Sequence, residues 1–74
     1  MWYKINDELI NLNRVVDIFK SGENELVFIL DIPVAGGGES YYGKMAETII
    51  KFTNASKRDY CFNKLIEILE AKTI

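Results

Sequence analysis

Hydrophobic and polar residues alternate with a period of two over much of residues 2–53, which is the pattern of β-strands. The clearest example is 25–33, where every even-numbered residue is apolar and Pro33 ends the strand, because proline cannot donate to a β-ladder. The same reasoning predicts strands at 2–5, 9–12, 15–20 and 45–53, with a turn at 6–7 and a hairpin connection at 21–24.

The pattern changes to a helical period after residue 56. A helix is expected over 57–72, with Ser56 as its N-cap and Asp59 three residues later. Its apolar residues span an arc of roughly 160°: Cys61, Phe62, Leu65, Ile66, Ile68 and Leu69. A stripe this wide favours a helix that lies across a sheet. We therefore expect one α+β domain, 1–74, in which a four- or five-stranded antiparallel meander carries one C-terminal helix on one face.

The apolar strand residues form two sets, one on each face of the expected sheet. The expected partners of the helix are Ile10, Leu12, Val16, Ile18, Leu26, Phe28, Leu30, Ile50 and Phe52. A second set would point to the other face: Val15, Phe19, Val27, Ile29 and Ile49, with Trp2 or Tyr3 nearby. One helix covers only one face of a sheet, so either the strands curl over each other or another subunit covers the second set. From this we predict a homo-oligomer, a dimer or an assembly of dimers.

The composition excludes several kinds of catalytic and metal site. Hydrophobic residues are 49% and charged residues 27% of the 74 residues, a mixture typical of a folded domain. The absence of histidine excludes triads and metal sites that need imidazole, and the single cysteine cannot form an internal disulfide. Cys61 is interpreted as a small buried hydrophobe. We expect no enzyme activity, no bound metal and no cofactor.

The charge and the hydropathy profile bear on partners and compartment. A formal net charge of −2 argues against duplex nucleic acid, whose binders usually carry a positive field. The amino terminus has no signal-peptide pattern, and no apolar run approaches the roughly 20 residues of a membrane helix. We expect a cytoplasmic protein without a membrane partner.

Residues 34–44 form the one long irregular segment. Gly38 to Lys44 has the spacing G-x-x-x-x-G-K of a phosphate-binding loop, but Met45 stands where a hydroxyl is needed and a strand follows instead of a helix. The segment still combines groups that suit a phosphate-bearing ligand, because glycines can form an anion nest and tyrosines can stack. The candidate ligand-binding residues are Gly36, Gly37, Gly38, Ser40, Tyr41, Tyr42 and Lys44. The alternative is a hairpin tip whose tyrosines pack on the sheet edge.

The order of elements resembles small single-domain bacterial and phage proteins. Those proteins begin with a tryptophan strand and an Ile-Asn-Leu-x-x-Val hairpin, here Trp2 to Ile5 and then Ile10-Asn11-Leu12-Asn13-Arg14-Val15. The resemblance implies a strand meander with a final helix and no shared chemistry. Compact acidic phage proteins of this size often sequester a ligand or block a host protein, so it also implies a counter-defence role as a hypothesis.

Two functions follow from these observations. In the first, a non-enzymatic oligomer sequesters a phosphate-bearing small ligand, such as a nucleotide, through 34–44. In the second, an inhibitor or adaptor docks on a host protein through its acidic surface or its exposed apolar sheet surface. Tyr60 lies on the polar side of the helix and is the candidate partner contact, because tyrosine is enriched at interface hot spots.

Overall fold

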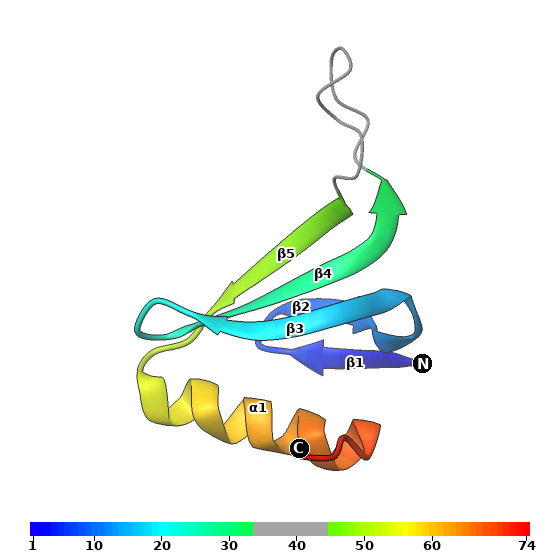
Figure 1. Ribbon diagram of the computed structural model, residues 1–74. Coiled ribbons are helices and arrows are strands. Elements are labelled where there is room, and N and C mark those ends of the chain that lie inside the picture. Colours follow the sequence, from blue (N-terminus) through cyan, green and yellow to red (C-terminus); the bar gives the residue numbers. More distant parts are fainter. Residues whose placement is uncertain (34–44) are drawn as a thin grey trace.

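The computed structural model describes residues 1–33 and 45–74, which form five antiparallel strands, a short 3₁₀ turn and one helix (Figure 1). The elements are β1 (Trp2–Ile5), β2 (Glu8–Asn11), η1 (Leu12–Arg14), β3 (Val15–Ser21), β4 (Glu25–Pro33), β5 (Met45–Lys51) and α1 (Ala55–Leu69). The α+β class with a C-terminal helix is confirmed. The single meander sheet is wrong, because β1 and β2 form one sheet and β3, β4 and β5 form another.

The 3₁₀ turn explains the division into two sheets. The Asn11 side chain accepts hydrogen bonds from the Asn13 amide and from the amino-terminal ammonium, each at 3.1 Å. The Leu12 amide donates to the Met1 carbonyl at 3.0 Å. These contacts end β2 in a tight turn that redirects the chain, so β3 pairs with β4 and not with β2.

A β-bulge in β3 changes which valine faces the core. Val15 pairs with Leu30 and Asp17 with Ile29, so Val16 is an extra residue without a cross-strand partner. Val15 packs against the core, whereas Val16 is 61% exposed. The prediction that Val16 packs on the helix and Val15 on the opposite face is therefore wrong, because the bulge shifts the alternation by one residue.

The core lies between the three-stranded sheet, the β1–β2 hairpin and α1 (Figure 1). Its buried residues are Ile5, Ile10, Leu12, Leu26, Phe28, Ile50, Phe52 and Leu65. Leu26 and Phe28 are fully buried at the centre of β4. The helix contributes Leu65 to this core, with Cys61 and Phe62 partly buried beside it. Among the described residues, no helix has the length and apolar character needed to cross a membrane.

The helix begins earlier than the sequence indicates. Asn54, and not Ser56, is the N-cap, and its side chain accepts a hydrogen bond from the Lys57 amide at 2.9 Å. Both residues are suitable caps, but the hairpin loop before β4 decides between them. Asn24 is hydrogen-bonded through both its carbonyl and its side chain to Phe52, which ends the extended segment there.

Arg58 fastens the start of α1 to the sheet. It is 8% exposed and donates to the Glu25 carbonyl at 3.2 Å and to the Asp59 carboxylate at 2.7 Å. Lys20 on β3 reaches the same carboxylate at 3.1 Å. These hydrogen bonds from Arg58 and Lys20 lower the pKa of Asp59 below its ordinary value of 3.8. The network fixes the first turn of α1 against β3 and β4.

Within residues 1–33 and 45–74, one face of the three-stranded sheet carries no helix. The pairing places nine residues on it, here called the uncovered face: Asp17, Phe19, Ser21, Glu25, Val27, Ile29, Glu47, Ile49 and Lys51. Phe19 is 43% exposed and Ile49 is 49% exposed, while Val27 between them is buried by its neighbours. Four of the five residues of the second apolar set are thus on one face, as predicted.

Candidate functional site

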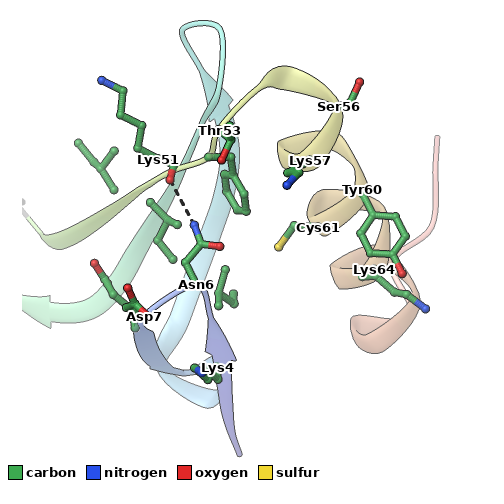
Figure 2. Close-up of a pocket in the computed structure, with 15 residues that line it drawn as sticks. Lys4, Asn6, Asp7, Lys51, Thr53, Ser56, Lys57, Tyr60, Cys61 and Lys64 are labelled. Carbon is green, nitrogen blue, oxygen red and sulfur yellow. Dashed lines mark hydrogen bonds between the residues drawn. The ribbon is translucent and has the colours of Figure 1, made fainter.

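A broad open cleft lies where three parts of the chain meet: the β1–β2 turn, the end of β5 and the first turns of α1 (Figure 2). Its volume is about 1010 Å³. It is called the basic cleft here, and its polar and reactive side chains are Lys4, Asn6, Asp7, Glu8, Lys51, Thr53, Ser56, Lys57, Tyr60, Cys61 and Lys64. Ligand sites of proteins are commonly of 300–1,000 Å³, so the space is ample for a mononucleotide.

The β1–β2 turn is held against the end of β5 by Asn6. Its backbone has a φ of 53°, a left-handed conformation that asparagine tolerates better than most residues. Its side-chain amide donates to the Lys51 carbonyl at 3.2 Å, as the dashed line in Figure 2 shows. This contact sets the wall of the cleft that faces α1.

The cleft gathers positive charge in a chain whose net charge is negative. Four of the seven lysines of the sequence line it, against two acidic residues, Asp7 and Glu8 on the turn. The first turn of α1, which the structure describes in full, has no acidic side chain. An anion at that end of the cleft would meet both the lysines and the positive end of the helix dipole.

Three residues of α1 supply the cleft with positive charge and an aromatic ring. Lys57, Tyr60 and Lys64 follow each other at i, i+3 and i+7, so they share one side of the helix. In Figure 2, Lys57 extends from α1 toward the strands, whereas Lys64 lies beside Tyr60. The Lys64 ammonium is 5.8 Å from the centre of the Tyr60 ring, and Tyr60 is 66% exposed.

Lys51 has a different orientation. Its side chain points away from α1 in Figure 2, and the strand pairing assigns it to the uncovered face. It therefore stands at the outer rim of the cleft and contributes to its field at longer range. The lysines best placed for direct contact with a bound anion are Lys57 and Lys64 on α1 and Lys4 on β1.

Cys61 is the one nucleophilic sulfur of the chain and its sulfur faces the cleft (Figure 2). It is partly buried and packs against the core. Burial raises the pKa of its thiol above the ordinary value of 9.0. Since the thiolate is the reactive form, this cysteine is a poor nucleophile near neutral pH. Among residues 1–33 and 45–74, no three side chains of the His, Cys, Asp and Glu types form a cluster suited to a metal ion.

The candidate residues named from the sequence fall in two places. Gly36, Gly37, Gly38, Ser40, Tyr41, Tyr42 and Lys44 lie outside the described residues. The described residues that flank them, Pro33 and Met45, are paired at the opposite end of β5 from Lys51. Tyr60 is described, is exposed as predicted, and lines the basic cleft.

Sequence reasoning missed the cleft because its lysines come from three separate elements. Lys4 precedes the first turn, Lys51 ends β5, and Lys57 is in the first turn of α1. The one local signal was the i, i+3, i+7 spacing of Lys57, Tyr60 and Lys64, which on its own is also typical of an ordinary solvated helix face.

Comparison with protein-family models, with curated proteins and with solved structures finds no match for this chain. The candidate function therefore rests on the geometry and charge of the basic cleft.

Proposed function

We propose that this protein is a non-enzymatic binding protein that holds a phosphate-bearing small molecule, of the size of a nucleotide, in the basic cleft. The observation that carries the proposal is the convergence of Lys4, Lys57 and Lys64 on one cleft, with Lys51 at its outer rim, in a chain with net charge −2. Random placement on the surface would leave these charges dispersed among the more numerous acids.

The phosphate is assigned to the α1 side of the cleft. Lys57 offers an ammonium there, and Thr53 adds a hydroxyl group to the lining, whereas the Ser56 hydroxyl points away from the strands (Figure 2). The helix N-terminus adds a favourable field. Asp7 and Glu8 on the opposite wall would repel a phosphate, which favours the α1 side over the turn.

The base or another flat group is assigned to Tyr60. Its ring is largely exposed beside the cleft, and Lys64 lies next to it. Stacking of a base on an aromatic side chain is worth about 1–3 kcal/mol, and a hydrogen bond to a charged group about 1.5–3 kcal/mol. After the cost of association is subtracted, these contacts suit a dissociation constant on the order of micromolar.

The side chains at hand support binding without turnover. The chain has no histidine to act as a general base near neutral pH. Cys61, whose pKa is raised by burial, is protonated at that pH and a weak nucleophile. The lysines can hold and neutralise a phosphate without activating water to attack it.

Isothermal titration calorimetry with ADP tests the proposal, with adenosine as the matched ligand that lacks phosphate. We expect ADP to bind at least tenfold more tightly than adenosine. Lys57→Ala is expected to weaken ADP binding by about 10- to 100-fold, the range of one charge-assisted contact. Lys72→Ala, which removes a lysine beyond the end of α1 and outside the cleft, is the matched control and is expected to bind as wild type. Equal affinity for ADP and adenosine, or equal losses in the two variants, would contradict the proposal.

A further inference from the structure

The uncovered face is organised in three rows that run across the strands. The strand pairing sets Phe19, Val27 and Ile49 side by side in the middle row. On one side of it lies the row Asp17, Ile29 and Glu47, and on the other side lies the row Ser21, Glu25 and Lys51. The middle row is wholly apolar, and Phe19 and Ile49 are both more than two-fifths exposed.

An antiparallel sheet that faces water normally has polar residues on its solvated face. Here an apolar row crosses all three strands, and α1 is on the other side of the sheet. Two sheets that pack face to face lie about 10 Å apart with their side chains interdigitated. The row is therefore suited to a second sheet, and the charged residues on either side of it indicate how that sheet is oriented.

We propose that the uncovered face binds the same face of a second copy of this chain, related by a two-fold axis that runs along the middle row. Such an axis places the middle row of one copy on that of the other. It also exchanges the two outer rows, so Glu47 of each copy lies opposite Lys51 of the second copy. Two-fold symmetry makes this ion pair twice, as expected for an isologous interface.

The charge pattern separates this arrangement from the other simple one. A two-fold axis parallel to the strands would stack β3 on β5 of the second copy. It would place Asp17 opposite Glu47 twice, which brings like charges together at a partly dry interface. The axis along the middle row instead sets Asp17 opposite the small polar Ser21. Opposite charges in one arrangement and like charges in the other select the first.

The two-fold axis has a consequence for the basic cleft. It brings the Met45 end of β5 in one copy beside the Lys51 end of β5 in the other, and that end lines the cleft. The dimer does not depend on the proposed ligand, because the α1 side of the cleft, to which the phosphate is assigned, contributes no residue to the uncovered face. The two surfaces share Ile49 and Lys51, which line the cleft from β5. Failure of one proposal leaves the other intact.

Sedimentation equilibrium and charge exchange test the dimer directly. Wild-type protein is expected to sediment as a species of twice 8.5 kDa at micromolar concentration. Glu47→Lys and Lys51→Glu are each expected to weaken the dimer by at least tenfold, and the double variant E47K/K51E is expected to restore it. Ile49→Asp is expected to abolish it, whereas Leu9→Asp, at a 68% exposed site on the β1–β2 hairpin, leaves it unchanged. Circular dichroism establishes that each variant is folded.

Three results would overturn the inference. Wild-type protein that stays at 8.5 kDa at high micromolar concentration excludes the dimer. A double variant no better than either single variant excludes the axis along the middle row. A dimer that survives Ile49→Asp uses another surface, and the uncovered face would then be a docking site for an unrelated protein.

Discussion

Leu65→Ala tests how α1 is held on the sheet. Leu65 is 4% exposed and is the apolar residue of α1 that belongs to the buried core. Truncation of a buried leucine to alanine costs about 2–5 kcal/mol, depending on how far the site collapses. A domain of this length is stable by about 4–11 kcal/mol at 0.05–0.15 kcal/mol per residue. The single substitution thus removes a large part of the stability.

The expected shift follows from the size of the domain. For a domain of 60–100 residues, 1 kcal/mol corresponds to about 4–8 °C in the melting temperature. A loss of about 3 kcal/mol therefore lowers it by about 12–24 °C. Urea denaturation followed by circular dichroism gives the free energy of unfolding directly. All variants are compared at one protein concentration, because subunit association adds to apparent stability.

Leu69→Ala is the matched control. It makes the same chemical change four residues later on the same helix, at a position that is 47% exposed. We expect its free energy of unfolding to stay within about 0.5 kcal/mol of wild type. If Leu65→Ala and Leu69→Ala were equally harmless, α1 would not pack on the sheet through Leu65, and the position of the basic cleft beside it would be wrong.

Three further predictions concern charge, the thiol and the glycine-rich segment. Because the pKa of Asp59 is lowered in the folded protein, its contacts with Arg58 and Lys20 stabilise above pH 3.8 and are lost below it, so Asp59→Asn should flatten the fall in melting temperature on acidification. Cys61 should react slowly with a thiol reagent at pH 7, faster as the pH rises past 9, and more slowly again when ADP fills the cleft. The basic cleft predicts wild-type ADP affinity in calorimetry for Lys44→Ala and Tyr42→Ala, and a loss of affinity in both would move the ligand site to the glycine-rich segment.

Local patterns predicted the strands well. The period of two located β4 to its last residue, Pro33, and the asparagine–aspartate pair located the β1–β2 turn. The ends of a strand depend on the backbone preferences of residues close together in the chain, and these preferences can be read from the sequence. The apolar row of the uncovered face followed from the same alternation.

Two features of the fold depend on contacts between distant residues and were not predictable in this way. The bulge at Val16 exists because β3 must pair with β4 while η1 redirects the chain, and the separation into two sheets has the same origin. Arg58 is buried because the Glu25 carbonyl and Asp59 accept its hydrogen bonds. Nothing near Arg58 in the sequence indicates those partners.

The candidate site also has one part that the sequence predicted and another that depends on tertiary contacts. Tyr60 was identified from its place on the polar side of the helix, and its exposed ring does line a cleft. Lys4 joins it only because the β1–β2 hairpin folds back toward α1, with Asn6 bonded to the Lys51 carbonyl. Charge that is dispersed along the chain becomes a cluster through tertiary structure.

The most direct test of the basic cleft is a nuclear magnetic resonance titration of ¹⁵N-labelled protein with pyrophosphate at millimolar concentration. Pyrophosphate carries the charge that the cleft is proposed to bind and nothing that binds elsewhere by stacking. We expect the amide signals of Ser56, Lys57 and Cys61 to shift in a saturable manner, those of Lys72 to stay in place, and the response to vanish in Lys57→Ala. Saturable shifts confined to residues 36–44, or no saturable shift in the cleft, would contradict the account.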